Sequence, residues 1–470
     1  LFIQDSTSYV GGSIQDSHLE GLLEISNLTV KDSTGYACGL YGKYSQGINS
    51  LDNYLLKISN SQLENCESKK AGIYLESADG KADTQLEQLK FRNIDRSVMF
   101  VSMQIAAKHL EFKDNSGIQV KSINSTMNIE DATFQNIEKE CVEMSDYSQL
   151  DCVNCLFQNN LGFCIRSEMR SSFNLSSNQF LENQAKVKGT AIFQSSGSKR
   201  SFIVDSVFKK NSCKGFQGTV NLIHSDLEIR NTTFEGNTGD SISFGINSNN
   251  ANLSIANSVF FNQKGYSGAF IYGSGSDIKV ISSAFEKGTV EADGGAIALT
   301  QSSLDVSDSN FTELSASQGG AIWGMFNSNL TVSGCKFYNN SGQGSSVFLF
   351  TGNLTFKNSQ VSKSKKIALY LSYLSGSKVD NSTFENLSSQ RGSAIFDTES
   401  VFSEVTNSEF KNCSSEVKGG AIYFHLKYYH PQSKTFKVDG CSFRNCSSDR
   451  GGGLFSENAS LDLRNTKFFS

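Results

Sequence analysis

The stretch GGAIALTQSSLDVSDSNFTELSASQGGAIWGMFNSNLTVSGCKF, from Gly294 to Phe337, contains almost two copies of one pattern. Each copy opens with GGAI, continues to a Leu-x-Val triplet at Leu304 or Leu330, and reaches a Phe five residues after the Val. The two glycine pairs are 25 residues apart and the two Phe are 26 residues apart. A period of this size in short alternating segments is typical of a solenoid of strands, with one coil per repeat.

A tight corner is predicted between the Leu-x-Val triplet and the Phe. Leu330 and Val332 point to one face of a strand, whereas the odd step from Val332 to Phe337 cannot continue that strand. Three residues before the Phe position most units carry Asn, Asp or Gly, which tolerate a left-handed backbone. Ser177 and Ser282 are the weaker fit, and only Gln88 and His109 break the row. We therefore predict a corner with positive φ. The predicted corner ladder includes Asn231, Asn257, Asp308, Asn358, Asn381, Asn407 and Asn465.

Nineteen Phe or aliphatic anchors occupy the Phe position from Ile3 to Phe468, at a mean spacing near 26 residues. They predict an all-β fold in which residues 1–470 form one continuous parallel β-helix of about 18 coils, single-stranded, with roughly 26 residues per coil. Like residues should stack inside it, with Phe on Phe, aliphatic on aliphatic, and Asn on Asn at the corner. The predicted Phe stack includes Phe208, Phe234, Phe260, Phe285, Phe311, Phe337, Phe384, Phe410 and Phe443. A single Pro in 470 residues agrees with a chain made mostly of ladders, because Pro removes a ladder donor.

The composition limits the possible partners. A net charge of -5 with dispersed Lys and Arg gives no basic stripe, so we expect no nucleic acid partner. No apolar run reaches the roughly 18 to 20 residues of a membrane span, and we expect no cofactor. The sequence contains no signal peptide, and its first residue is Leu1 and not Met, so we expect a processed chain or a part of a longer one.

Four of the eleven cysteines have matching positions in consecutive coils. Cys413 and Cys446 each lie three residues after an anchor, and Cys141 and Cys164 each lie seven residues after one. Equal phase on neighbouring coils places two Cα atoms about 5 Å apart, which suits a disulfide. We predict both bridges, and hence a location outside the reducing cytosol. The odd number leaves at least one thiol free or bonded to another chain.

Two weaker groups have the residue types of metal ligands. Cys152 and Cys155 form a CxxC without a second CxxC or a paired His. His425 and His430 lie in the long interval between Phe410 and Phe443, where we predict a side loop over 424–436. We expect neither group to bind a metal, because the ligand set is incomplete in both.

Fourteen Asn-x-Ser/Thr triplets occur in the chain. Asn252, Asn329 and Asn353 each precede an inward Leu, so alternation points them to solvent and makes them the best predicted N-glycosylation sites. The other predicted sites are Asn174, Asn458, Asn412, Asn445 and Asn386. The last three follow an inward Phe by two residues, so they point inward unless the strand ends there. Asn231 and Asn381 occupy the corner position, where burial in the ladder is the alternative.

Two motifs alternate in step along the chain. GGAI occurs at Gly294, Gly319 and Gly419, and FxxN begins at Phe112, Phe180, Phe208, Phe234 and Phe337. These motifs resemble the repeats of the chlamydial polymorphic outer membrane proteins and of related repeat proteins in single-celled eukaryotes, over most of Phe112 to Phe468. The resemblance implies a right-handed parallel β-helix with a surface-exposed adhesive or structural role. Many Phe units here read FxN instead, and with the sequons this departure favours a eukaryotic extracellular protein.

An enzyme is the rival class, because polysaccharide lyases and hydrolases use the same kind of scaffold. Such sites need clustered acids, or calcium carboxylates with a basic residue. No two aspartates are adjacent here and the five His are dispersed, so we expect no enzyme.

A row of aromatic residues follows the Ile of GGAI and must face outward. It is formed by Phe193, Trp323, Phe396 and Tyr423. It is either covered by the chain's own loops or available for lateral contact with sugars or another solenoid.

Both ends of the sequence, LFIQDS and RNTKFFS, have the pattern of coil interior. An open sheet edge recruits another strand, so either the chain continues or copies dock head to tail, which without closure gives a filament. Our hypothesis is a glycosylated structural β-solenoid that builds an extracellular fibre, coat or surface adhesive layer. Its partners would be copies of itself and attached glycans. The alternative within the binding class is a monomeric cell-surface adhesin.

Overall fold

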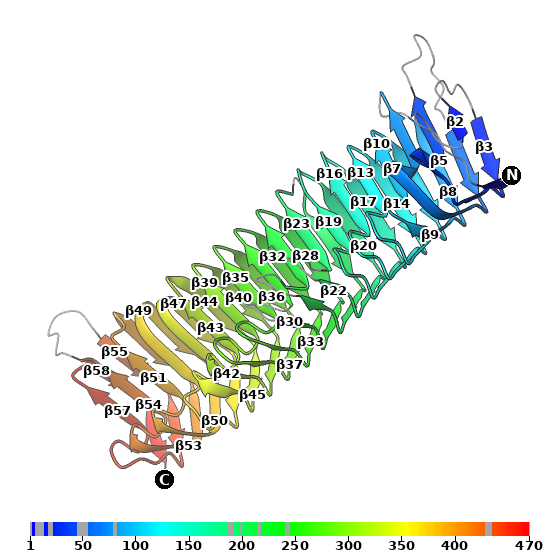
Figure 1. Ribbon diagram of the computed structural model, residues 1–470. Helices are drawn as coiled ribbons and strands as arrows, with labels where there is room; N and C mark the ends of the chain where they lie inside the picture. Colours follow the sequence, from blue (N-terminus) through cyan, green and yellow to red (C-terminus); the bar gives the residue numbers. More distant parts are fainter. Residues whose placement is uncertain are drawn as a thin grey trace. The chain divides into compact units, whose positions relative to one another are not determined.

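The computed structural model describes residues 2–4, 14–16, 22–44, 55–78, 82–185, 191–197, 199–213, 218–239, 245–427 and 435–469. The chain divides into two compact units, unit 1 (Leu1–Glu228) and unit 2 (Ile229–Ser470). Each unit is a stack of turns made of parallel strands, which follow one another in chain order (Figure 1). The described residues contain no helix, and hence none that could span a membrane.

Each turn contains a first strand, a middle strand and an anchor strand. In one turn of unit 2 these are β39 (Ile297–Thr300), β40 (Ser303–Ser307) and β41 (Asn310–Thr312). The first strand carries the Ile of GGAI, the middle strand carries Leu-x-Val, and the anchor strand carries the Phe. Alternation turns Leu304 and Phe311 into the interior, where both are fully buried.

The strand bounds follow this plan throughout. The first strands are β2 (Ile14–Asp16), β5 (Thr34–Tyr44), β10 (Val98–Val101), β13 (Val120–Ile123), β16 (Val142–Ser145), β19 (Ile165–Ser167), β23 (Ile192–Ser195), β27 (Val220–Ile223), β31 (Ile246–Asn249), β35 (Ile271–Ser274), β39, β43 (Ile322–Met325), β51 (Ile395–Thr398), β54 (Ile422–His425) and β57 (Leu454–Glu457). The middle strands are β3 (Leu22–Ser26), β6 (Leu55–Ser59), β8 (Asp83–Glu87), β11 (Gln104–Lys108), β14 (Thr126–Glu130), β17 (Gln149–Val153), β20 (Ser172–Ser176), β24 (Ser201–Val204), β28 (Asp226–Arg230), β32 (Asn252–Ala256), β36 (Asp277–Ile281), β40, β44 (Ser328–Ser333), β52 (Phe402–Thr406), β55 (Thr435–Asp439) and β58 (Ser460–Arg464).

The anchor strands are β1 (Phe2–Gln4), β4 (Thr29–Lys31), β9 (Lys90–Ile94), β12 (Glu111–Lys113), β15 (Thr133–Gln135), β18 (Leu156–Gln158), β21 (Gln179–Leu181), β25 (Val207–Lys209), β29 (Thr233–Glu235), β33 (Val259–Phe261), β37 (Ala284–Glu286), β41, β45 (Lys336–Tyr338), β48 (Gln360–Ser362), β56 (Ser442–Arg444) and β59 (Lys467–Phe469). Long strands that continue around a corner are β7 (Gln62–Ser77), β47 (Val347–Lys357), β49 (Leu369–Asp380), β50 (Thr383–Arg391) and β53 (Glu409–Lys418). Short fourth strands are β22 (Gln184–Ala185), β26 (Ser212–Cys213), β30 (Thr238–Gly239), β34 (Lys264–Gly265), β38 (Thr289–Val290), β42 (Ser315–Gln318) and β46 (Ser341–Gln343).

The predicted anchors are paired in register within each unit. The register runs from Ile3 to Phe208 in unit 1 and from Phe234 to Phe468 in unit 2. The number of turns is about 15, slightly fewer than the 18 predicted. That residues 1–470 form one continuous solenoid stays a prediction, because it depends on how the two units are joined.

The anchor Phe side chains form stacks inside each unit. The ring centroids of Phe260 and Phe285 are 4.9 Å apart and those of Phe285 and Phe311 are 5.0 Å apart, with the rings nearly parallel. Val361 interrupts the row in unit 2. There Phe356, from the interior of β47, fills the space at 5.8 Å from Phe337 and 5.9 Å from Phe384. The core therefore keeps its aromatic filling although the anchor is small.

The corner before each anchor has a left-handed backbone. The φ angle is 50° at Asn257, 51° at Asp308 and 50° at Asn407, and it is positive also at Gln88 and His109, the two exceptions of the sequence. The corner side chains are exposed, including those of Asn231 and Asn381. The corner asparagines therefore lie on the outside of the turns and not in the interior, because a left-handed residue turns its side chain away from the interior. Asn does meet Asn at the outer corner, where Asn381 Nδ2 donates to Asn358 Oδ1 at 2.8 Å. The remaining members of the corner ladder, Asn358 and Asn465, are exposed as well.

Two buried polar ladders occupy the interior beside the corners instead. Three residues after the anchor, Asn183 accepts hydrogen bonds from Asn160 N (3.0 Å) and Nδ2 (2.9 Å), and its Nδ2 donates to Phe157 O at 3.0 Å. Two residues before the anchor, Ser283 Oγ accepts from Ser258 N at 3.2 Å and donates to Ile281 O. These side chains satisfy backbone groups that the turn leaves without a strand partner.

Candidate functional site

The eight asparagines predicted as glycosylation sites are all exposed. Asn252, Asn329 and Asn353 point outward from middle strands, as alternation predicts. Asn174 and Asn458 are exposed too. The structure therefore leaves each of these side-chain amides at the surface.

Three sequon asparagines two residues after the anchor form a surface row. Asn386, Asn412 and Asn445 have φ angles of 55°, 50° and 51°, so a second left-handed corner turns them outward. Asn412 Nδ2 donates to Asn386 Oδ1 at 3.0 Å, and Asn445 Nδ2 donates to Asn412 Oδ1 at 3.2 Å. The inward direction that strict alternation gives is wrong here because the strand bends at this residue.

The predicted cysteine pairs occupy adjacent turns as free thiols. Cys164 O accepts a hydrogen bond from Val142 N, and the Cys141 thiol lies within hydrogen-bond reach of the Cys164 thiol. Burial and then this contact raise the pKa of Cys141. A hydrogen bond with Cys446 and burial raise the pKa of Cys413. Both disulfides stay predictions, and the structure provides the neighbouring positions that they require.

A third cysteine pair was not predicted. Cys38 and Cys66 share a hydrogen bond between their thiols, which lowers the pKa of Cys66. Cys66 lies three residues after the anchor Leu63, the same phase as Cys413. Cys38 lies in β5, where irregular register hides its phase from sequence reasoning.

The two weak metal candidates have different surroundings. Cys152 and Cys155 are buried, and Cys155 N donates to Asn178 Oδ1 at 2.7 Å, so Cys155 takes part in the ladder before the anchor. His425 Nδ1 lies 3.2 Å from Thr398 Oγ1, while His430 and most of the predicted side loop fall outside the described residues. Within the part of the chain that the structure describes, no three His, Cys, Asp or Glu side chains are grouped as metal ligands.

Two of the four residues of the outward aromatic row are covered by the chain itself. Trp323 is 9% exposed and Tyr423 is 1% exposed, whereas Phe193 and Phe396 are half-buried. Trp323 Nε1 donates to Gln318 Oε1 at 3.3 Å, and Lys418 Nζ lies 5.8 Å from the centre of the Tyr423 ring. Two alternatives were open for this row, cover by the chain itself or lateral contact with a partner. Trp323 and Tyr423 are covered by the chain itself.

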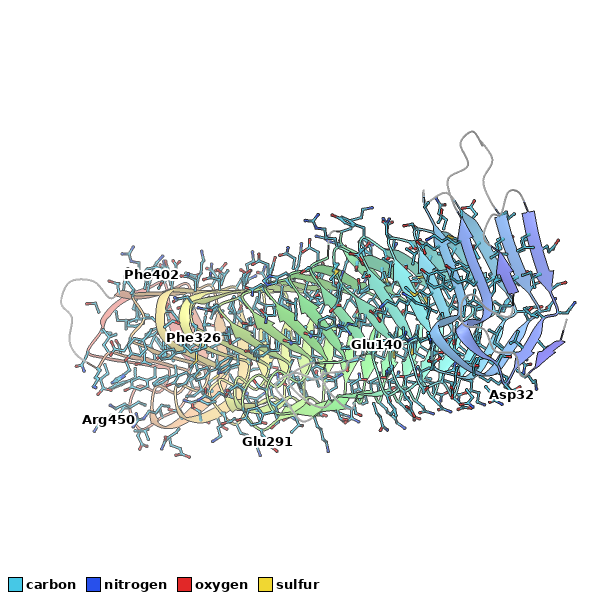
Figure 2. All side chains as sticks on the ribbon, turned by 45° about the horizontal axis from the view of Figure 1, so that its top comes forward. Asp32, Glu140, Glu291, Phe326, Phe402 and Arg450 are labelled. Carbon is cyan, nitrogen blue, oxygen red and sulfur yellow. The ribbon has the colours of Figure 1, made fainter. Side chains whose placement is uncertain are left out.

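A different set of aromatic residues is exposed in unit 2. Phe326 and Phe402, which are labelled in Figure 2, are 57% and 44% exposed, and Tyr373 is 53% exposed. Phe326 and Tyr373 have positive φ, at the corner between the first and middle strands. No prediction from the sequence pointed to these residues, because the exposure of Phe326 and Tyr373 depends on the bend of the backbone.

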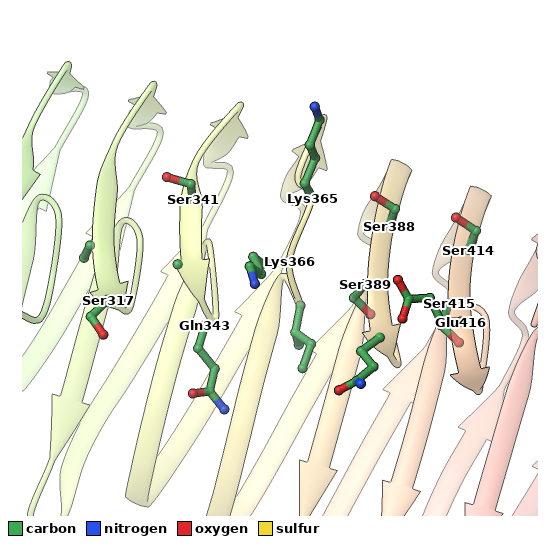
Figure 3. A pocket seen from close by; sticks show the side chains of 14 residues that line it. Ser317, Ser341, Gln343, Lys365, Lys366, Ser388, Ser389, Ser414, Ser415 and Glu416 are labelled. Carbon is green, nitrogen blue, oxygen red and sulfur yellow. The ribbon is translucent and has the colours of Figure 1, made fainter.

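A polar groove of about 1040 Å³ lies on the side of unit 2 that carries the fourth strands. Its lining comes from turns that succeed one another, with Ser341 and Gln343 on one flank and Ser388 and Ser389 on the other (Figure 3). Lys365 and Lys366 stand between the two flanks (Figure 3). No sequence-based prediction pointed to this groove, although the interval from the anchor Val361 to Ala368 is shorter than the equivalent intervals of the other turns of unit 2.

The sequence matches the model of a known protein family. Residues 20–208 and 267–430 match the family model described as a right handed beta helix region. The chain therefore belongs to this family, and the predicted fold class, a right-handed parallel β-helix, is confirmed.

Solved structures similar to the chain have low identity. They include the complex of Vag8 with C1 inhibitor (8% identity, 100% of each chain covered, TM-score 0.43). They also include PfbA, a surface adhesin of Streptococcus pneumoniae (9% identity, 69% of this chain and 83% of that chain, TM-score 0.23). A mutant of the alginate lyase AlyGC has 10% identity over 100% of this chain and 97% of that chain, with a TM-score of 0.24. A search of curated proteins found no match.

Proposed function

We propose that the chain is a glycosylated structural β-helix protein of the cell exterior, which forms or decorates an extracellular fibre, coat or adhesive layer. The observation that supports this proposal is the exposure of all eight predicted sequon asparagines. An acceptor asparagine must be accessible to carry a bulky, solubilising glycan. In a chain whose alternate residues face a closed interior, a sequon placed at random would be buried about as often as it is exposed.

Secretion of the chain from a eukaryotic host, followed by mapping of its glycopeptides, tests this proposal. We expect glycans on Asn252 and on at least one of Asn329 and Asn353. Those two lie on adjacent turns with Asn353 Nδ2 donating to Asn329 Oδ1 at 2.9 Å, so two bulky glycans would crowd each other. Asn257, exposed but outside a sequon, is the control. A secreted chain that is unmodified at all three positions would contradict the proposal.

The proposed location implies that the paired cysteines are oxidised. Peptide mapping without reduction should recover Cys141 linked to Cys164 and Cys413 linked to Cys446. Cys335 and Cys441 are buried in separate turns and serve as internal controls that stay thiols. Complete alkylation of all of these cysteines in the unfolded, unreduced secreted protein would argue against an oxidising compartment.

End-to-end contact between copies is the assembly part of the proposal. Coils of two copies would stack as coils stack within the chain, where β56 pairs with β59 and the ring centroids of Phe443 and Phe468 are 4.8 Å apart. We expect concentration-dependent association in sedimentation velocity, reduced in Phe468→Ser. A monomer at all concentrations, or equal association of the variant, would remove this part.

Two finer points belong to the same proposal. The GGAI and FxxN motifs support a relationship to the polymorphic outer membrane proteins, and the sequons support a eukaryotic member of this kind. The exposed aromatic side chains of Phe326, Tyr373 and Phe402 favour the second candidate, a monomeric adhesin. Replacing all three by Ser should then abolish adhesion of protein-coated beads to host cells without changing the far-UV spectrum. Unchanged adhesion would remove this candidate.

A further inference from the structure

One strand is missing from the stack of fourth strands in unit 2. β46 pairs with β42 on one side and is the last strand of its sheet. In the next turn, residues 365–367 alone connect Ser364 to Ala368, and they form no strand. One turn further on, residues 388–393 connect Leu387 to Ala394 and belong largely to β50. The turn that contains residues 365–367 is therefore too short to form a fourth strand beside those of the neighbouring turns.

The far flank of the gap is also a strand edge. The segment from Leu387 to Arg391 pairs with Cys413 to Lys418 of β53 on the side away from the gap. On the side that faces the gap, Ser388 N donates to Ser364 O at 3.0 Å, and β50 has no strand partner beyond this point in the described residues. Two strand edges therefore face each other across the groove.

The gap has the width of one strand. Neighbouring strands lie about 4.8 Å apart, so two strands separated by an absent one are about 9.6 Å apart. The short connection passes beneath the groove, because Ser364 is buried and its Oγ donates to Ser345 Oγ at 2.6 Å. The space left above it is the groove of about 1040 Å³.

We propose that this groove binds an extended acidic peptide segment of a partner protein, which enters as the missing strand between β46 and β50. Strand edges present alternating N–H and C=O groups that an extended backbone can pair with on both sides. A polysaccharide has no such alternation of donors and acceptors at the spacing of a strand. The geometry of the flanks therefore favours a peptide over a glycan.

The charge of the groove specifies the acidic character of the peptide. Lys365 and Lys366 are exposed, and neither forms an ion pair with a described residue. Glu416 is the one acidic side chain that lines the groove, and it lies in the turn farthest from β46. Carboxylates on alternate residues of the peptide would lie near the two lysines, while small polar residues would fit beside the serines of the flanks.

Fluorescence anisotropy with the full chain tests the proposal. The probe is a fluorescein-labelled peptide of sequence Glu-Thr-Glu-Val-Glu-Thr, and its control is the same peptide with alternate backbone amides N-methylated. We expect saturable binding of the first peptide and at least tenfold weaker binding of the second, since N-methylation removes backbone donors but keeps every charge. Amide hydrogen exchange at Gly342 and at Gln390, on the two flanks, should slow when the peptide is bound, whereas Ser341 N and Ser388 N already donate to Leu314 O and Ser364 O and should not change.

Two variants connect the binding to the groove. Lys365→Glu with Lys366→Glu should weaken binding at least tenfold, whereas Lys336→Glu with Lys357→Glu, exposed lysines outside the groove, should not. Replacing 365–367 by Ser-Ser-Gln-Arg-Gly-Ser, the segment 388–393 of the next turn, should fill the gap and abolish binding in a folded protein. Equal binding of the N-methylated peptide, retained binding in the filled variant, or competition by polygalacturonate with unchanged exchange at the flanks would overturn the proposal.

Discussion

The asparagine of FxxN stabilises the turn after the anchor through its side-chain amide. Asn183 Oδ1 accepts from the Asn160 backbone, and Asn183 Nδ2 donates to Phe157 O. An amide side chain has both a donor and an acceptor, so one residue satisfies backbone groups of the preceding turn. The repeated Asn is thus explained by buried hydrogen bonding.

Substitution of this asparagine should be costly. Asn183→Ala leaves Asn160 N and Phe157 O buried without these partners, and an unsatisfied buried group costs about 1–3 kcal/mol. We expect the free energy of unfolding to fall by about 2–4 kcal/mol in urea titrations. The control Asn174→Ala removes an exposed asparagine and should change it by less than about 0.5 kcal/mol. Similar losses in the two variants would contradict a special role for the buried ladder.

Two cysteines in the serine position before the anchor should make stability depend on pH. Burial raises the pKa of Cys335 and of Cys441 to about 11, from an ordinary value of 9.0. Because the folded state holds these thiols protonated, the stabilisation is complete below pH 9.0 and is lost as the pH rises to about 11. At pH 11 each thiol would contribute a loss on the order of 2 kcal/mol.

The matched variant is Cys335→Ser with Cys441→Ser. Serine occupies the equivalent position in neighbouring turns, where Ser309 Oγ accepts from Ser283 N at 3.1 Å, so the ladder is kept while the titrating group is removed. Urea titrations at pH 8 and pH 10.5 should show a smaller loss of unfolding free energy in the double variant than in the unaltered chain. An equal loss would assign the alkaline sensitivity to other groups.

At the scale of the elements, the sequence predicted the strands because the interior imposes a strict alternation. Leu304, Val306 and Phe311 have the spacing that only a bent strand can bury together. The direction of the corner side chains could not be predicted in the same way. Asn381 and Asn386 face outward because φ is positive at each, and a single sequence shows residue preference without showing side-chain direction.

The groove escaped sequence reasoning for a related reason. Its cause is the short connection 365–367, and a change of two or three residues in one turn resembles ordinary variation in loop length. Its effect appears only when β46 and β50 are seen as edges of a gap. The cysteine pairs could be predicted in part. Their phase in the sequence places them in adjacent turns, but it does not show whether they are oxidised.

The first glycine of GGAI allows the entry into the first strand. Gly319 has φ of 61°, and a Cβ there would approach Ile322 O and Trp323 Cβ to 2.6 Å each. We expect Gly319→Ala to lower the free energy of unfolding by at least about 2 kcal/mol, since left-handed strain alone costs about 1–2 kcal/mol. Gly376→Ala is the control, because a Cβ there has one contact, at 3.6 Å. A tolerated Gly319→Ala would mean that the loop relaxes at little cost.

At the scale of the whole molecule, each turn pairs only with the turns before and after it, so stability should be local. The single tryptophan, Trp323, lies in unit 2 and is nearly buried, whereas far-UV circular dichroism reports strands of both units. The two signals can therefore separate local from global unfolding in one denaturant titration. A protein that unfolds in one step would give coincident transitions.

Two anchor variants make this comparison decisive. Phe134 in unit 1 and Phe311 in unit 2 are both fully buried in stacked rows, and replacing such a ring by Ala costs about 3–5 kcal/mol. Phe134→Ala should shift part of the circular dichroism transition to lower guanidinium chloride concentration and leave the Trp323 fluorescence midpoint unchanged. Phe311→Ala should shift both signals, because its strand β41 pairs with β45 in the turn that contains Trp323. If Phe134→Ala moved the fluorescence midpoint as far as Phe311→Ala does, the free energy of unfolding would belong to all turns jointly rather than to neighbouring turns.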